Sequence, residues 1–296
     1  MNWNDPLSTS LLDFLFEAKQ NGLKSPLTVA GGFGLFLKKQ YLIEHGKKTL
    51  FPIKGVVRST EDIDLFVHVD ILCDQQQFQC ILNTLRSLGY EVVDSAKYMQ
   101  WKKSIDLRED TGYVKIDFLA GNVDVNGDKL HTKSPRVRNR QVEGLHAHVT
   151  PEALFIDEKA LEIPFAGERN CGVKYQTTIC IPHPFTYLLM KLFAFRDREN
   201  DTNRQSGAHH AFDIFTIIGS LTEAELDETI DLAQKSFQEP VFQEARQIVM
   251  NRFTTSSQKG TIAIRSHELY FHYEVKYLNE FLNVMTEIFG TSKPFS

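Results

Sequence analysis

The chain has 296 residues, of which 42% are hydrophobic and 24% are charged, and its formal net charge is −5. This is ordinary globular composition, and we expect two domains because single cores tend to split beyond roughly 250 residues. Because the net charge is negative, the chain as a whole has no positive electrostatic field that attracts nucleic acid. Any binding of nucleic acid must therefore rest on a local basic patch.

Cysteine spacing and the lack of long apolar runs favour a cytoplasmic protein. The four cysteines, Cys73, Cys80, Cys171 and Cys180, form no CxxC pair and no zinc-ligand spacing, so we expect reduced thiols. The N-terminal segment has no positively charged leader, and no apolar run approaches the roughly 18 residues that a membrane helix needs. We therefore expect a cytoplasmic location and no membrane partner.

The first part of the chain mixes predicted strands and helices, and the last part is helical. In chain order, the hydrophobic spacing predicts a helix that ends at Asn21, a strand and glycine turn at 27–32, a helix at 33–45, a strand at 62–69, a helix at 73–90, and strands at 91–94, 97–109 and 112–121. Residues 121–180 are mostly extended, and the pattern after His183 is helical almost to the end. We therefore predict an α+β fold, with a mixed β-sheet and flanking helices over 1–182 and a C-terminal helical domain over 183–296.

Three acidic residues on two of these strands are candidate metal ligands. Asp62 and Asp64 share one face of their strand, with Cα atoms roughly 6.5–7 Å apart. Asp117 interrupts an apolar run, where a lone acid is costly to bury unless it is paired or binds metal. Carboxylates this close repel unless a cation lies between them, and Mg²⁺ (or Mn²⁺) suits an oxygen-only site. The alternative is three solvated acids at strand ends.

A glycine pair lies between the strand at 27–30 and the helix that follows. Gly31 and Gly32, followed by Phe33, would let the backbone approach a ligand closely, and the N–H groups of the next helix favour an anion. The alternative is a tight turn without a ligand. Three acids can hold two metal ions, one of which activates an attacking hydroxyl while the other carries a triphosphate. Together with a glycine loop that binds the phosphates, such a site predicts nucleotidyl transfer from an NTP.

The helix predicted after His183 contains a lysine in an otherwise apolar stretch. Lys191 either extends to the surface or is aimed at an anion, where it would balance triphosphate charge. Asp213 on a later helix could orient Lys191 or Arg196 through a charge-assisted hydrogen bond. The alternative for Asp213 is an acid with no partner.

The segments VAGGFGLFL, RSTEDIDL and KLFAFRDR, in this order, resemble the AbiEii/AbiGii-type nucleotidyltransferases of the polymerase-beta-like nucleotidyltransferase superfamily. The resemblance covers roughly residues 26–220 and implies a nucleotidyltransferase fold for the first domain. The nucleotide-binding residues that it implies are Gly31, Gly32, Phe33, Arg58, Ser59, Lys191, Arg196 and Asp213. The catalytic residues that it implies are Asp62, Asp64, Asp117 and Lys191, with the three aspartates as the metal ligands.

Two positions depart from the family pattern. Phe33 stands where the family loop commonly carries a hydroxyl residue, so backbone N–H groups must replace that donor. His209 and His210 stand where the family has a Lys-Asp pair before the last aspartate. These departures keep open a catalytically silent NTP-binding or partner-binding module on the same fold.

We therefore predict a metal-dependent enzyme that moves an NMP from an NTP to an acceptor hydroxyl on RNA such as tRNA, on a protein or on a small molecule. The resemblance also implies a toxin of a toxin–antitoxin pair, with an antitoxin as partner. An antibiotic adenylyltransferase is a further alternative with the same chemistry. The basic segment KSPRVRNR at 133–140 is a candidate contact for an RNA backbone, and a solvated loop is the alternative.

Overall fold

The computed structural model describes residues 5–52, 62–107, 110–123, 128–201 and 206–290. The chain divides into two compact units, described separately below. The first unit comprises 1–38, 59–151 and 155–182, and the second comprises 39–58, 152–154 and 183–296. The chain leaves the first unit for the last time after Pro182. Whether the two units are domains that fold independently stays a prediction.

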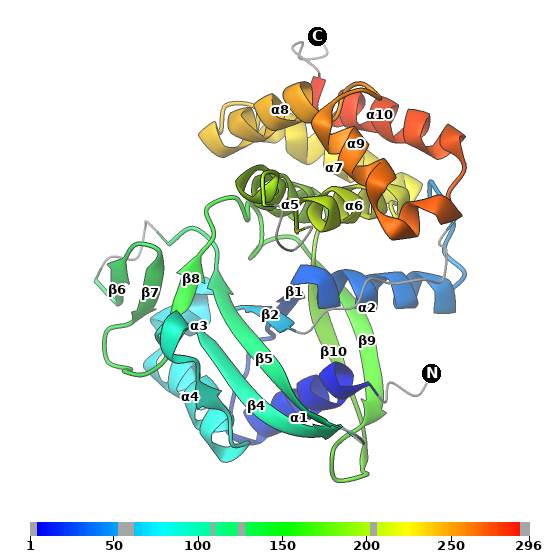
Figure 1. The fold of residues 1–296 in the computed structure, drawn as a ribbon. Coiled ribbons are helices and arrows are strands. Elements are labelled where there is room, and N and C mark those ends of the chain that lie inside the picture. The colour runs from blue at the N-terminus through cyan, green and yellow to red at the C-terminus, as the bar shows by residue number, and fades with distance from the viewer. Residues whose placement is uncertain (1–4, 53–61, 108–109, 124–127, 202–205, 291–296) are drawn as a thin grey trace. The chain divides into compact units, whose positions relative to one another are not determined.

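Ten strands among the described residues form one sheet in the first unit (Figure 1). They are β1 (Thr28–Ala30), β2 (Asp62–Phe66), β3 (Glu91–Val92), β4 (Gln100–Leu107), β5 (Asp110–Ala120), β6 (Leu130–Lys133), β7 (Arg136–Asn139), β8 (Ala147–Val149), β9 (Ala160–Glu168) and β10 (Lys174–Pro182). The order is β6-β7-β8-β5-β2-β1-β10-β9, with β4 paired to β5 and β3 to β4. Because β2 is parallel to β5 and antiparallel to β1, the predicted mixed sheet is confirmed.

Helices flank this sheet, as predicted. Those that begin in the first unit are α1 (Pro6–Gln20), α2 (Gly31–Glu44), α3 (Val69–Cys73), α4 (Gln75–Ser87) and the short 3₁₀ helix η1 (Asp94–Ala96). Helix α1 begins at Asp5, whose carboxylate accepts hydrogen bonds from the N–H groups of Leu7 and Ser8. It packs against α4 and against β2 and β5 (Figure 1).

One face of β2 and β5 is part of the core of the first unit. Ile63 and Leu65 on β2 and Ile116 and Phe118 on β5 are buried, and the ring of Phe14 from α1 lies 6.4 Å from that of Phe118. Because side chains alternate along a strand, the polar residues between these positions must point to the opposite face. This alternation fixes where the acids of the two strands lie.

The second unit consists mainly of helices, which confirms the predicted helical C-terminal part. They are α5 (Pro184–Arg198), α6 (Ser206–Gly219), α7 (Glu223–Lys235), α8 (Pro240–Arg252), α9 (Lys259–Ser266), the 3₁₀ helix η2 (Glu268–His272) and α10 (Val275–Gly290). Phe215 lies at the centre of an aromatic core with Phe51 and Phe281. Phe51 also donates its N–H to the carbonyl of Gly219, which holds an early segment of the chain on this unit. Among the described residues, no helix combines the length and the apolarity that a membrane span requires.

Candidate functional site

The pairing of β2 with β5 places three carboxylates on one face of the sheet. Asp64 lies directly opposite Asp117, and Asp62 lies directly opposite Lys115. Directly opposite residues of adjacent strands share a face, as do residues two apart on one strand. Asp62, Asp64 and Asp117, here called the carboxylate face, therefore lie next to one another on the side of the sheet opposite Ile63 and its apolar neighbours.

The first residue of α2 lies against this face. Ala30, the last residue of β1, is directly opposite Asp64, so the chain enters α2 beside that carboxylate. Gly31 has a φ of +63°, and a Cβ built on it would lie only 1.7 Å from Oδ2 of Asp64. Glycine is required here both for its backbone conformation and for the space that Asp64 occupies. The glycine pair and the acids, predicted to be neighbours, are brought together.

Two polar side chains of the same face contact the carboxylates. Nζ of Lys115 lies 3.4 Å from Oδ1 of Asp62, and Nε2 of Gln100 donates to Oδ2 of Asp117 at 3.0 Å. Gln100 reaches its partner because β4 places it directly opposite Asp117. These contacts offset part of the repulsion among the three acids.

The pKa of Asp117 is raised to about 7. Burial is the largest cause, and the negative charge of Asp64 is the next. The hydrogen bond from Gln100 and the charge of Lys115 act in the opposite direction, while Asp62 adds a smaller rise to the pKa. A carboxyl group that titrates near neutral pH can act as a general base or can bind a cation in exchange for its proton.

The structure places the other predicted residues of the glycine loop in different surroundings. Gly32 follows Gly31 in the first turn of α2. The side chain of Phe33 is buried and its ring stacks on Phe36, so only its backbone N–H could meet a ligand. Arg58 and Ser59 lie outside the described residues.

Lys191 and Asp213 form a buried ion pair within the second unit. Nζ of Lys191 lies 2.8 Å from Oδ2 of Asp213, and the two residues are 7% and 6% exposed. Of Lys191 and Arg196, the two cations predicted as partners of Asp213, Lys191 is the one that donates a hydrogen bond to it. A charge held this firmly on the helix pair α5–α6 has a fixed direction, which is what recognition of an anion requires.

Arg196 does not contact Asp213. Its guanidinium pairs with Asp197 and Glu244 and lies 4.6 Å from the centre of the Phe193 ring. Arg196 is five residues beyond Lys191 on α5, which at 3.6 residues per turn is not a whole number of turns, so the two cations leave the helix in different directions. Its predicted role in nucleotide binding remains a prediction.

Within the part of the chain that the structure describes, His209, His210 and Asp213 do not form a group that could hold a metal ion. Nδ1 of His209 is hydrogen-bonded to Nε2 of His267 at 2.9 Å, and Nε2 of His210 lies 2.6 Å from Nη1 of Arg198. The two histidines thus have structural partners on other elements.

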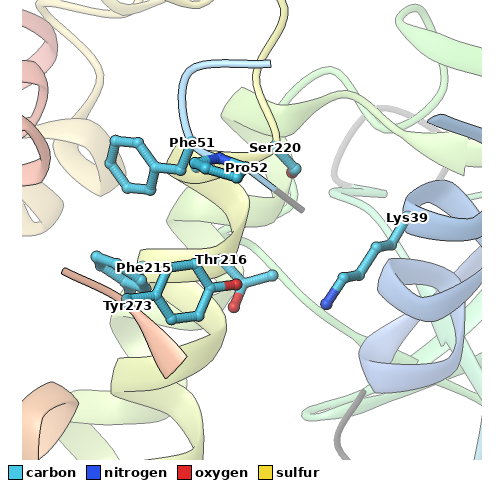
Figure 2. A pocket seen from close by; sticks show the side chains of 8 residues that line it. Lys39, Phe51, Pro52, Phe215, Thr216, Ser220 and Tyr273 are labelled. Carbon is cyan, nitrogen blue, oxygen red and sulfur yellow. The ribbon is translucent and has the colours of Figure 1, made fainter. Parts of the chain in front are cut away.

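Lys39, on α2, lines a small pocket of the second unit that the sequence did not indicate. Figure 2 shows its amine and the hydroxyl groups of Thr216 and Tyr273 directed toward a common space. Burial lowers the pKa of Lys39 to about 8. The cavity measures about 10 Å³, which is at the lower limit for one water molecule, so it is too small for a substrate.

The carboxylate face offers the oxygen donors that a hard cation prefers, but it does not supply a full set of ligands. Within the described ranges, no three His, Cys, Asp or Glu side chains form a group that could hold a metal ion by themselves. Mg²⁺, however, typically takes one or two carboxylates and completes its shell with phosphate oxygens and water. The oxygen-only donors, the mutual repulsion that raises the pKa of Asp117 and the space that Gly31 leaves for Asp64 fit such a substrate-completed site.

Sequence reasoning missed Gln100 and Lys115. Lys115 is two residues from Asp117 on a strand, so the alternation of strand side chains is a signal that could have identified it. Gln100 reaches the site only through the register of β4 with β5, which the sequence does not specify.

Comparisons with known proteins give a likeness to a solved structure. No protein-family model and no curated protein matches the chain. Among solved structures, the chain is similar to an antigenic nucleotidyltransferase-like protein from Paracoccidioides brasiliensis, with 16% sequence identity and a TM-score of 0.44. The match covers 90% of this chain and 97% of that chain. Membership of a family does not follow from a likeness at this level.

Proposed function

We propose that the protein is a metal-dependent nucleotidyltransferase that moves an NMP from an NTP to an acceptor hydroxyl. The observation that carries the proposal is the position of Asp64, directly opposite Asp117 and against the backbone of Gly31. Neighbouring carboxylates suit a divalent cation, and the N-terminus of a helix suits phosphate. A metal–triphosphate substrate needs both at one place.

Asp64, Asp117 and Asp62 would hold Mg²⁺ or Mn²⁺ together with phosphate oxygens of the substrate. Bound there, the ion would neutralise triphosphate charge and stabilise the leaving pyrophosphate. Lys115, which contacts Asp62, would keep that carboxylate oriented and reduce the repulsion among the three acids. Gly31 would keep the first N–H groups of α2 close enough to bind phosphate oxygens.

In the transfer step, the acceptor oxygen forms a bond to the α-phosphorus of the NTP. The bond from that phosphorus to the oxygen bridging to the β-phosphate breaks, and pyrophosphate leaves with the electron pair. Asp117 would accept the proton of the acceptor hydroxyl through a carboxylate oxygen that does not bind the ion. Atoms and charge balance because the proton lost by the acceptor is held by Asp117.

From the resemblance of its helix, we also propose that Lys191 supplies a cation to the triphosphate. Asp213 would fix the direction of its ammonium group. The acceptor is proposed to be RNA such as tRNA, a protein or a small molecule, and a toxin role with an antitoxin partner rests on the resemblance alone.

One observation favours the alternative of a silent NTP-binding module. Phe33 is buried, so the loop lacks a side-chain donor at that position. An enzyme with this loop must align the terminal phosphates for transfer with backbone N–H groups alone. A binding module only has to hold the nucleotide, so it does not need to align the phosphates.

The experiment is a transfer assay with each α-labelled NTP, Mg²⁺ and total cellular RNA and protein as acceptors. We expect label in one acceptor class with the wild-type chain and none with Asp62→Asn or Asp64→Asn. Asp231→Asn, an exposed change of the same chemistry on α7, is the matched control and should transfer normally. Transfer retained in both site variants would refute the proposal. NTP binding without transfer in the wild-type chain would establish the silent module.

A further inference from the structure

A hairpin in the first unit carries four basic side chains on one of its faces. In the pairing of β6 with β7, His131 lies directly opposite Arg138 and Lys133 lies directly opposite Arg136. Directly opposite side chains share a face, and so do residues two apart on a strand. All four side chains therefore project from the same side of the hairpin.

The opposite side of the hairpin is held in the core, which fixes the direction of the cations. Leu130 and Val137 are buried, and so is Asn139, whose Nδ2 donates to the carbonyl of Leu72 at 2.9 Å. A register shift by one residue would bury the charges, so the pattern specifies this orientation strongly. The cationic side is thus a property of the fold and not of a flexible loop.

These cations line an open cavity of about 350 Å³. Its lining residues are Tyr98, His131, Lys133, Arg136, Val137, Arg138, Glu143, Gly144 and His146. We call His131, Lys133, Arg136, Arg138 and His146 the basic face. Among the lining residues that the structure describes, Glu143 is the acidic one, beside the charged residues Lys133, Arg136 and Arg138.

Like charges directly opposite one another in a sheet are destabilising, so the pair Lys133–Arg136 is costly without an anion. Burial and the charges of Arg138, Arg136 and His131 lower the pKa of His146, which reports the local positive potential. The guanidinium of Arg138 donates to the carbonyls of Asn139, Arg140 and Val142 and is thereby fixed in place. Lys133 and Arg136 are then the cations best placed to meet a ligand.

An aromatic side chain borders the basic face. Tyr98 is 44% exposed, and its ring packs edge-on against His146 with 5.6 Å between ring centroids. The carbonyl of Tyr98 accepts a hydrogen bond from the N–H of His146 at 3.1 Å. Exposed aromatic rings beside rows of cations are what proteins use for single-stranded nucleic acid, because a base stacks on the ring while phosphates meet the cations.

We propose that the basic face binds the sugar–phosphate backbone of a single-stranded nucleic acid, with a base stacked on Tyr98. Basic side chains paired across a hairpin suit successive phosphates of a strand better than one isolated anion. The binding itself does not depend on the carboxylate face. That the bound strand belongs to the acceptor of nucleotidyl transfer is a consequence that rests on the proposed function.

The test is fluorescence anisotropy of a fluorescein-labelled oligouridylate with the full chain at several salt concentrations. The variant K133Q/R136Q should bind about tenfold more weakly, and its dependence of log affinity on log salt should be shallower by about 0.7 for each lost phosphate contact. The control K19Q/K174Q removes the same charge from exposed positions elsewhere in this unit and should bind as the wild type. Circular dichroism of each variant verifies the fold.

Three results would overturn the proposal. The first is equal binding by K133Q/R136Q and the wild type. The second is equal weakening by the two double variants, which would mean that only net charge matters. The third is displacement of the strand by UMP at the same phosphate concentration, which would make the cavity a mononucleotide site. D64N should bind the strand as the wild type does. Strand binding by a wild-type chain that transfers no nucleotide would refute the proposed function and leave the binding proposal standing.

Discussion

Gly31 leaves room for the carboxylate of Asp64, because a Cβ at residue 31 would lie 1.7 Å from Oδ2 of Asp64. This contact joins the start of α2 to the centre of the carboxylate face. A substitution at the start of α2 should therefore also disturb the carboxylates. This consequence can be tested at Gly31 and at Asp64.

Gly31→Ala should disturb the site and the fold together. The left-handed φ alone costs roughly 1–2 kcal/mol of unfolding free energy for a residue with a Cβ, and Asp64 must also move. A displacement of about 1 Å at a catalytic group lowers activity about 100-fold. Transfer assays and denaturant unfolding measure the two effects.

Gly89→Ala is the control for this prediction, because Gly89 also has a positive φ, of +76°, but no heavy atom within 4 Å of its added Cβ. It should lose stability for the backbone reason alone and keep full activity. Wild-type transfer by Gly31→Ala would show that the contact with Asp64 has no functional role.

Asp64→Asn should lower the pKa of Asp117. The charge of Asp64 is the second largest cause of the rise in that pKa, while the larger cause, burial, stays unchanged. Gln100→Leu should move the same pKa upward, because it removes a hydrogen bond that favours the ionised form. Carbon-13 NMR titration of the Asp117 carboxyl carbon measures both shifts, and an unchanged value in Asp64→Asn would place the two carboxylates out of electrostatic contact.

Asp117→Asn should stabilise the fold at alkaline pH. The pKa of Asp117 is about 7 in the folded chain and 3.8 in the unfolded chain, so the ionised carboxyl lowers stability progressively between these pH values and fully above about pH 7. The gain from Asp117→Asn should therefore be larger near pH 8 than near pH 5, by about 2 kcal/mol. Urea unfolding at the two pH values measures it. A gain that shrinks as pH rises would contradict the assigned direction.

The buried pair Lys191–Asp213 gives a prediction for the second unit. Lys191→Met leaves a carboxylate buried without its cation and should cost about 3–5 kcal/mol of unfolding free energy. The double variant Lys191→Met/Asp213→Leu replaces both charges by apolar groups and should recover most of this loss. If Lys191 binds the triphosphate, the double variant is folded and inactive in transfer. Full activity in that folded variant would assign the pair to stability alone.

Much of the fold could be predicted from the sequence because its elements have strong local signals. The alternation around Ile63 and Ile116 indicates strands, and the apolar spacing after His183 indicates helices. Boundaries were less accurate. The strand predicted from residue 97 begins at Gln100, because Lys97 and Tyr98 adopt positive φ values that no strand contains.

The acids of the site could be predicted because a carboxylate in an apolar strand is conspicuous, as Asp117 is. The register that places Asp64 opposite Asp117 and Gln100 beside it could not be predicted, because pairing between distant strands depends on tertiary packing. The partner of Asp213 was left open between two cations for the same reason. Which of two helix residues faces a neighbouring helix is decided by how the helices pack.

The most direct test of the central claim is a crystal of the full chain soaked with Mn²⁺ and a non-hydrolysable NTP, measured for anomalous scattering. The account predicts an anomalous peak within coordination distance of the carboxylates of Asp64 and Asp117, with triphosphate oxygens completing its shell beside Gly31. A manganese peak elsewhere in the chain with none at these carboxylates, or a triphosphate bound away from Gly31, would contradict it.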